Sequence, residues 1–326
     1  MSTPVEVAGR LVVKRLALLC GVLLLIVVVA SAWMRLSGAG LGCADWPACY
    51  GHPGVTSMAG TVLGVEGVRL VHRIAATAAL LITIAMVWLC WRRRPALRAE
   101  GQIAYRLLII MLGLSLLGWF VGSATLPVVV LMNLLGGFAM LALVWRLYVV
   151  AASDAANDAA NDAASSAATT SHRLGWLRLG AVLLLAEIVL GALISADFAG
   201  LACTTLPNCG GIWWPSGEWG YAFNPLRDFA GRPLGAGEAG GVALHMLHRA
   251  LALTSALVLG VASLRVAARA GMLAIAVPAL LLVEIVLGLA SVRFGLNLWL
   301  VVAHNLVAAL LFAATIVLLR RLAQTR

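Results

Sequence analysis

Residues 16–34 read LALLCGVLLLIVVVASAWM, a continuous run of uncharged, mostly apolar side chains. A helix needs about 20 such residues to cross roughly 30 Å of hydrocarbon. The run is continuous rather than alternating, which favours a membrane helix over a barrel strand. It is too long for the core of a signal peptide, and no typical small-residue cleavage site follows it, so we interpret it as a retained transmembrane helix.

The composition extends this prediction to the whole chain. Of its 326 residues, 63% are hydrophobic and only 11% are charged, against about 25% charged in soluble domains. We therefore predict an all-α membrane protein with eight transmembrane helices, an even number that leaves both termini on one side. The expected helices lie near residues 16–34, 68–91, 105–124, 127–149, 174–196, 242–264, 272–292 and 297–319.

The formal net charge of +10 has a topological explanation. The basic residues gather in short segments at the ends of apolar runs, such as WRRRPALR and SHRLGWLR, and these segments share one face of the membrane. The positive-inside rule makes that face cytoplasmic. We thus expect a multi-pass protein of the bacterial inner membrane, with both termini cytoplasmic, lipid as its surroundings and no nucleic-acid partner.

Residues 151–173 begin with AASDAANDAANDAASSAATTS, a low-complexity stretch with too few large side chains to form a core. We predict a flexible cytoplasmic linker there, between an N-terminal half at 1–150 and a C-terminal half at 174–326. The halves resemble each other, because GAGLGCADWPACYG (38–51) parallels FAGLACTTLPNCGG (198–211) and LVHRIA parallels MLHRAL. We expect two parallel four-helix repeats related by a pseudo-two-fold axis along the membrane normal.

Four of the six cysteines fall in the two expected outer loops, namely Cys43, Cys49, Cys203 and Cys209. Each loop holds two of them, separated by five residues that include a proline. In an oxidising compartment such pairs tend to form disulfides, and a catalytic dithiol is the alternative. A metal site lacks further ligands in either loop. Cys20 and Cys90 lie within helices, where we expect them to pack as small apolar residues.

Histidines lie in or at the ends of the expected helices, where polar groups are costly and usually functional. His72 and His248 occupy equivalent repeat positions, each followed by an arginine, and His304 lies about two turns into the last helix. From facing helices, His248 and His304 reach one plane, as two axial ligands of a heme iron require. Arg249 is a candidate for the heme propionates, with an interfacial anchor as the alternative reading.

Other polar groups accompany these histidines. His245 and its repeat counterpart Arg69 each lie one turn before a candidate ligand, which suggests contact with the ligand's surroundings or with propionates. The pentapeptide EIVLG occurs at 187–191 and again at 284–288. Its glutamates make a proton relay an alternative, although a shared packing or hydrogen-bonding role is favoured. Zinc or copper is a weaker alternative, because no carboxylate or thiolate is placed to accompany the histidines.

The chain resembles the heme A synthase family in RLSGAGLGCADWPACYG, HRIAA, ISADFAGLACTTLPNCGGIWWP, VALHMLHR and LNLWLVVAHNL, which occur in the family's order. The resemblance implies eight helices and one heme site in each half. It assigns His248 and His304 to a resident heme b. It also implies that His72, Arg73 and the region of Asn133 hold the substrate, heme O.

The implied reaction oxidises the C8 methyl group of heme O to a formyl group, by successive hydroxylations with water as the oxygen source. Heme b would pass the electrons onward. A heme O synthase and the cytochrome oxidase assembly machinery are the implied partners. Homo-oligomerisation is left open by the sequence.

Two positions in the N-terminal half depart from the family pattern. Asn133 stands where the family has a histidine, and Arg69 stands where it usually has a glutamate. The nearest acid, the catalytic candidate Glu66, precedes His72 by six residues, or about 600° of helix, which points it away from the face of His72. The alternatives are therefore a non-enzymatic bis-histidine heme protein for electron transfer or heme handover, and an outer-face thiol oxidoreductase that uses Cys43 and Cys49.

Overall fold

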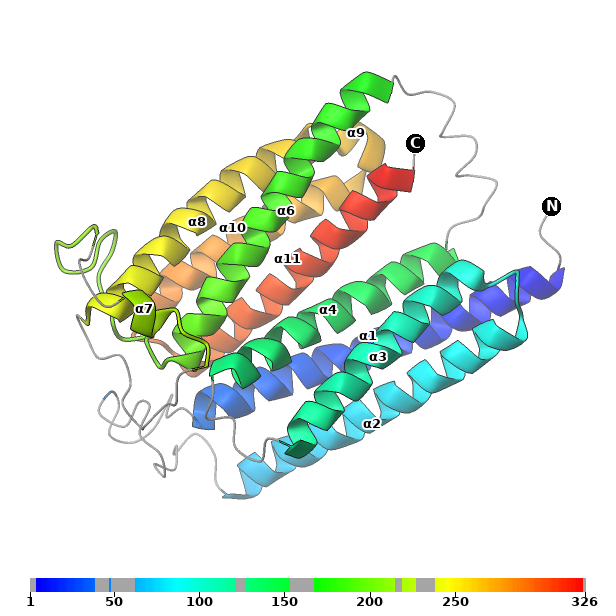
Figure 1. Cartoon of the computed structure of the whole chain (residues 1–326), viewed down its shortest axis with the longest axis horizontal. Helices are drawn as coiled ribbons and strands as arrows, with labels where there is room; N and C mark the ends of the chain where they lie inside the picture. The colour runs from blue at the N-terminus through cyan, green and yellow to red at the C-terminus, as the bar shows by residue number, and fades with distance from the viewer. Residues whose placement is uncertain are drawn as a thin grey trace.

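The computed structural model describes residues 4–38, 47, 62–120, 127–152, 167–214, 219–226 and 238–324. In these residues the regular structure is helical throughout (Figure 1). The helices are α1 (Pro4–Gly38), α2 (Val62–Arg92), α3 (Arg98–Phe120), α4 (Pro127–Ala152), α6 (Ala167–Ala196), α7 (Trp219–Ala222), α8 (Ala239–Leu264), α9 (Ala267–Ala270), α10 (Met272–Arg293) and α11 (Leu298–Gln324).

Eight of the helices in the described part of the chain are long and apolar enough to cross a membrane. The remaining two, α7 and α9, have four residues each. The prediction of an all-α protein with eight membrane-spanning helices is therefore confirmed. The start of α1 and the end of α11 lie at the same end of the molecule, and the long connection from α6 to α8 lies at the opposite end (Figure 1).

Several helix ends differ from the sequence prediction. The third helix, expected at 105–124, begins at Arg98 and ends at Phe120, and α6 begins at Ala167 instead of 174. The last part of the expected linker is thus helical, while residues 153–166 lie outside the described ranges. Apolar runs mark only the hydrocarbon-spanning part, whereas arginine and glutamate are good helix formers that continue the helix beyond it.

The helices form two four-helix bundles that lie side by side (Figure 1). In the first bundle α1 packs on α2, α2 on α3, α3 on α4 and α4 on α1. In the second, α6, α8, α10 and α11 pack in the same cyclic order. The bundles meet through α1 and α4 on one side and α6 and α11 on the other. A two-fold relation between repeats requires this neighbour order, and the relation itself stays a prediction.

The apolar core continues from one bundle into the other. Leu24 of α1, Leu147 of α4, Leu177 of α6 and Leu311 of α11 are fully buried members of one cluster. Many large apolar side chains instead face outward, as expected for helices in contact with lipid; Trp119 is 85% exposed. Close packing inside a membrane relies on small residues, because lipid provides no hydrophobic drive for helix association.

One glycine illustrates this packing between α6 and α8. A Cβ atom at Gly180 would lie 2.8 Å from the Cα atom of Leu259, a distance that real Cβ atoms do not show. The missing side chain lets the two backbones approach closely. This contact lies at Leu259, eleven residues after His248 on α8.

Candidate functional site

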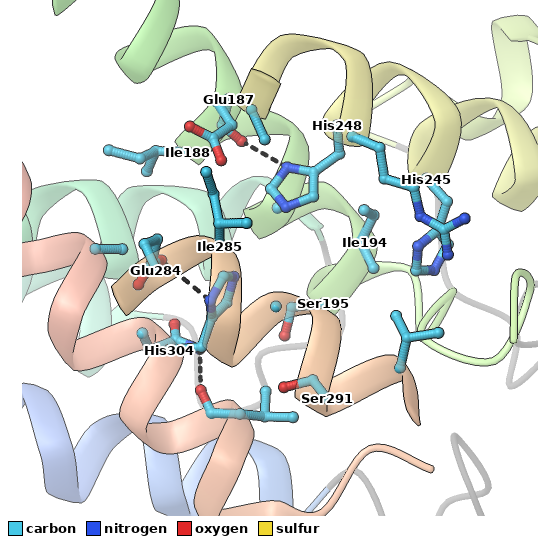
Figure 2. A pocket seen from close by; sticks show the side chains of 18 of the residues that line it. Glu187, Ile188, Ile194, Ser195, His245, His248, Glu284, Ile285, Ser291 and His304 are labelled. Carbon is cyan, nitrogen blue, oxygen red and sulfur yellow. Dashed lines mark hydrogen bonds and ion pairs between the residues drawn. The ribbon is translucent and has the colours of Figure 1, made fainter. Parts of the chain in front are cut away.

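Two histidines from different helices face each other inside the second bundle. His248 lies on α8 and His304 on α11, and the centroids of their imidazole rings are 6.5 Å apart with an angle of 83° between the ring planes. Figure 2 shows the two rings pointing toward one another. Both line a cavity of about 320 Å³, a volume in the range of about 300–1,000 Å³ that is usual for ligand pockets.

The walls of this cavity are largely apolar and come from both bundles. Leu36 of α1 and Leu134 and Phe138 of α4 line it from the first bundle, while Leu184 and Leu281 belong to the second. Within this lining, polar atoms are concentrated at a few side chains, among them the two histidines. The cavity is therefore suited to a large, mostly apolar ligand that needs a small number of polar contacts.

His248 is oriented by α6. Its Nδ1 lies 3.2 Å from the main-chain oxygen of Glu187. Since a carbonyl oxygen only accepts hydrogen bonds, this contact places a proton on Nδ1 and leaves a lone pair on Nε2. The ring edge also lies against Gly191, where a Cβ atom would come within 3.1 Å of His248 Cε1. The imidazole is thus held in one orientation with Nε2 available as a ligand.

His304 has a corresponding environment on α10. Its Nδ1 lies 3.2 Å from Oε1 of Glu284, and its Cε1 would lie 3.3 Å from a Cβ atom at Gly288. The contact with Glu284 has the distance of an ion pair without aligned hydrogen-bond geometry. Among the described residues, His304 Nδ1 and Glu284 Oε2 are both buried and have no hydrogen-bond partner. Unpaired buried polar atoms are costly and are typical of functional sites.

Glu187 directs its carboxylate elsewhere. Ser255 of α8 donates a hydrogen bond of 3.2 Å to Glu187 Oε2. Glu187 and Glu284 are both buried and both line the cavity, so two carboxyl groups lie beside the two imidazoles. Figure 2 shows them on the same side of the histidine pair. The repeated EIVLG motifs therefore belong to the site, as their predicted packing or hydrogen-bonding role requires.

The facing imidazoles fit a heme iron. Two bonds of about 2 Å from a metal to imidazole nitrogens, plus roughly 1 Å from each nitrogen to its ring centre, give a centroid separation of about 6 Å. The observed separation of 6.5 Å is close to this value. By contrast, no group of three or more His, Cys, Asp and Glu side chains gathers as a metal cluster in the part of the chain that the structure describes. The donor set therefore suits a metal that brings its own equatorial ligands.

Arg249 takes part in the rim of the cavity. Its guanidinium donates hydrogen bonds to the main-chain oxygens of Thr205, Pro207 and Cys203, at 2.9, 3.1 and 3.3 Å. The side chain thus fastens the loop that follows α6 to α8. Both roles expected from the sequence for Arg249, contact with propionates and anchoring at the membrane interface, stay predictions.

His245, one turn before His248, is buried, and its ring is directed away from the ring of His248 (Figure 2). Its Nε2 lies 2.9 Å from the main-chain oxygen of Ala199, which follows the end of α6. Since that oxygen only accepts, Nε2 carries the proton. His245 therefore ties α8 to the beginning of the loop and supports the position of His248 indirectly.

The same loop contains the disulfide between Cys203 and Cys209, whose Cα atoms are 5.0 Å apart. Both cysteines are buried, which favours a structural role over thiol exchange with a partner. This disulfide was predicted from the sequence and is confirmed. Cys43 and Cys49 lie outside the described residues. Cys20 and Cys90 are free and buried, as the packing interpretation expects.

An arginine that the sequence analysis did not single out connects the first bundle to this site. Arg35 of α1 donates hydrogen bonds to Ser195 of α6 and, at 3.1 Å, to Asn305 of α11. Ser195 and Asn305 both line the cavity, and Asn305 is adjacent to His304. A cation within a membrane helix, at the start of RLSGAGLGCADWPACYG, was the available signal.

The candidate residues of the first bundle are arranged differently. Glu66 and Arg69 form an exposed ion pair of 2.8 Å on α2, and their side chains are 60% and 49% exposed. His72 is half-buried, Arg73 is exposed, and Asn133 of α4 is exposed. The helix is regular from Val62, so Glu66 and His72 lie on different faces. The structure brings Glu66 to Arg69, and it records no contact between His72 and Asn133.

Comparison with known proteins gives two kinds of match. A family model described as cytochrome oxidase assembly protein, COX15-CtaA, matches residues 14–61 and 65–316. The chain is 29% identical over 321 residues to the heme A synthase of Shewanella oneidensis, covering 88% of this chain and 89% of that protein. It is also 35% identical over 141 residues to the heme A synthase of Rhizorhabdus wittichii, covering 42% of this chain and 38% of that protein.

Proposed function

The chain belongs to the COX15-CtaA family of cytochrome oxidase assembly proteins, and from that premise we propose that it is a heme A synthase that binds heme b between His248 and His304. The family resemblance expected from the sequence motifs is thereby confirmed. The observation that carries the heme b assignment is the pair of facing imidazoles, 6.5 Å apart in a largely apolar cavity.

The proposed reaction is the conversion of the C8 methyl group of heme O into the formyl group of heme A. With water as the oxygen source, R–CH₃ and H₂O give R–CHO with four protons and four electrons released. A bound heme b would supply a one-electron carrier for these electrons. The formyl product serves cytochrome oxidase assembly, and a heme O synthase provides the substrate.

The residues of the second bundle have assigned roles in this proposal. His248 and His304 would hold the iron through Nε2, because each Nδ1 faces an acceptor on α6 or α10. The apolar walls limit the access of water to the site. Arg249 and the disulfide loop fasten the rim, which keeps α8 and its histidine in place.

The first bundle is the proposed location of the substrate, with His72 as the iron ligand and Asn133 and Arg73 beside the porphyrin. Asn is a poor heme ligand, so His72 would be the protein ligand that holds the iron of the substrate. Glu66 is the proposed acid or base. It lies in the first turns of α2, where it forms an ion pair with Arg69. A non-enzymatic heme protein is not favoured, because two curated relatives are named heme A synthase.

We also propose the orientation in the membrane. The start of α1, the end of α2, the start of α6 and the ends of α8 and α11 lie at the end of the molecule opposite the connection from α6 to α8 that contains the disulfide (Figure 1). Arginines occur near each of these helix ends. By the positive-inside rule this end is cytoplasmic, which puts the disulfide loop in the periplasm of an inner-membrane protein.

Co-expression with a heme O synthase in a host that lacks heme A tests the activity. We expect heme A in the extracted pigment, detected by chromatography and mass. Recovery of unchanged heme O with heme b alone contradicts the synthase assignment.

A second measurement tests the heme b ligands. We expect His248→Ala and His304→Ala to lose the low-spin bis-imidazole spectrum of the purified protein. His172→Ala is the matched control, because His172 is exposed near the start of α6 and does not line the cavity. Survival of the spectrum in both ligand variants means that the iron is bound elsewhere.

A further inference from the structure

The pentapeptide EIVLG occurs in two helices that each contact one cavity imidazole. Residues 187–191 lie in α6 against His248, and residues 284–288 lie in α10 against His304. Glutamate and glycine are four residues apart in each copy, which puts both on one face of the helix. Figure 2 shows Glu187 beside His248 and Glu284 beside His304.

The glycine of each copy makes room for the ring. Cβ atoms at Gly191 and Gly288 would lie 3.1 and 3.3 Å from Cε1 of His248 and His304, tighter than ordinary van der Waals contacts. Cε1 is the ring atom between the two nitrogens. A methyl group at either position would therefore push the imidazole by a few tenths of an ångström and turn Nε2 away from its present direction.

The glutamate of each copy faces Nδ1. The main-chain oxygen of Glu187 lies 3.2 Å from Nδ1 of His248, and the carboxyl Oε1 of Glu284 lies 3.2 Å from Nδ1 of His304. In a helix the carbonyl of residue i bonds to the amide of residue i+4. Because residue 191 is glycine, the ring of His248 on α8 has space to approach the main-chain oxygen of Glu187 on α6.

The two copies differ in where the carboxylate points. The Glu187 carboxylate accepts a hydrogen bond from Ser255, whereas Glu284 Oε1 lies 3.2 Å from Nδ1 of His304. A carboxylate at the far nitrogen of a metal-binding imidazole makes that imidazole a stronger donor. Nδ1 of His248 therefore has a main-chain acceptor, and Nδ1 of His304 has a carboxyl oxygen within ion-pair distance.

We propose that the two EIVLG motifs are imidazole-positioning elements, in which Gly191 and Gly288 set the ring orientations and the Glu284 carboxylate makes His304 the stronger donor of the two iron ligands. This inference rests on the proposed heme b site. The four motif residues act through the histidines and have no contact of their own with the iron in this assignment. Their effects are consequently expected in the spectrum and potential of the heme.

The first test compares three glycine variants of the full-length heme-loaded protein. We expect Gly191→Ala and Gly288→Ala to retain heme but to shift the low-spin electron paramagnetic resonance signal. Gly260→Ala is the matched control on α8, because a Cβ atom there would lie 3.7 Å from Leu281, an ordinary contact, and we expect its signal to equal that of the unmodified protein.

Gly180→Ala separates ring orientation from general packing damage. Its Cβ atom would meet the backbone of α8, so we expect a lower yield and thermal stability with an unshifted signal in the folded fraction. Unshifted signals in both Gly191→Ala and Gly288→Ala overturn the glycine part of the proposal.

The second test uses the two glutamates. We expect Glu284→Gln to raise the midpoint potential of the heme, because a neutral amide beside Nδ1 makes the imidazole a weaker donor than a carboxylate does. Glu187→Gln keeps the main-chain acceptor and the partner of Ser255, so a smaller shift is expected. Equal shifts in the two variants overturn the assigned asymmetry.

The His248→Ala and His304→Ala variants distinguish a failure of the proposed heme b site from a failure of the positioning role of the EIVLG motifs. Loss of the signal in His248→Ala and His304→Ala together with unaltered glycine and glutamate variants overturns the positioning role alone. Retention of the signal in the histidine variants overturns the heme b site, and with it this inference.

Discussion

Arg35 donates a hydrogen bond to Ser195, the residue 160 positions after it in the chain. The same interval separates Cys43 from Cys203 and Cys49 from Cys209, so Arg35 and Ser195 occupy equivalent positions in the two repeats. Two residues that are related by a two-fold axis can contact each other only if both lie close to that axis. This contact supports the predicted pseudo-two-fold relation, and it joins α1 of the first bundle to the wall of the cavity that holds His248 and His304.

Removing the Arg35 side chain is expected to weaken the association of the two bundles. Arg35→Ala leaves Ser195 and Asn305 without their donor, and hydrogen bonds to a charged group contribute about 1.5–3 kcal/mol. Thermal unfolding of the detergent-solubilised protein measures this loss. Arg178→Ala is the control, because Arg178 is exposed and its removal is expected to change stability by about 0.5 kcal/mol or less. Equal stabilities of the two variants contradict the prediction.

Replacing Cys203 and Cys209 by serine is expected to destabilise the loop that Arg249 fastens. A short disulfide loop contributes roughly 2 kcal/mol by restricting the unfolded chain. We expect a lower unfolding temperature and increased protease cleavage between α6 and α8. Alkylation followed by mass spectrometry, with and without reductant, first establishes that the bond is present in the unmodified protein. An unaltered unfolding temperature in the double variant would mean that the hydrogen bonds of Arg249 are sufficient.

His72→Ala is expected to separate the two proposed heme sites. His72 lies on α2 in the first bundle, so the low-spin signal from His248 and His304 is expected to remain. Heme A formation is expected to fall, because heme O loses its iron ligand. Pigment analysis and the spectrum of one preparation measure both quantities. If heme A formation is unchanged, the substrate is bound without His72.

Asn133→His is expected to increase the heme content of the first bundle. His248 and His304 lie on helices at diagonal corners of their bundle, and α2 and α4 are the corresponding corners of the first. An imidazole at position 133 would supply the ligand that asparagine does not. We expect the heme-to-protein ratio to rise, and the additional heme to disappear in the His72→Ala, Asn133→His double variant. A ratio equal to that of the unmodified protein contradicts this arrangement.

The fold class was readable from the sequence because apolar runs such as residues 16–34 meet the length requirement of a bilayer directly. Helix ends were less accurate, as at Arg98, since the apolar signal stops before the helix does. His248 was identified by its repeat counterpart His72, and both His248 and His304 by the cost of polar groups in a membrane. The disulfide between Cys203 and Cys209 followed from spacing and compartment.

The contacts of the polar side chains could not be predicted from the sequence. Arg249 has a charge suited to a propionate, yet in the structure its guanidinium is directed to three carbonyl groups of a loop more than forty residues away in sequence. Arg35 contacts the other half of the chain, and no local pattern specifies such a partner. Glu187 and Glu284 are each followed by the same four residues, IVLG, but direct their carboxylates to different groups.

The sequence by itself determined the helical membrane fold, the two similar halves and the residue types able to hold a heme, because hydrophobic length, repetition and side-chain chemistry are local properties. Only the tertiary structure decided which imidazole nitrogen faces which acceptor, which glycine supports each ring and which arginine bridges the bundles. Those relationships depend on the packing of α1, α6, α8, α10 and α11 against one another. Helix packing brings together residues that are far apart in the chain, so their contacts cannot be derived from local sequence.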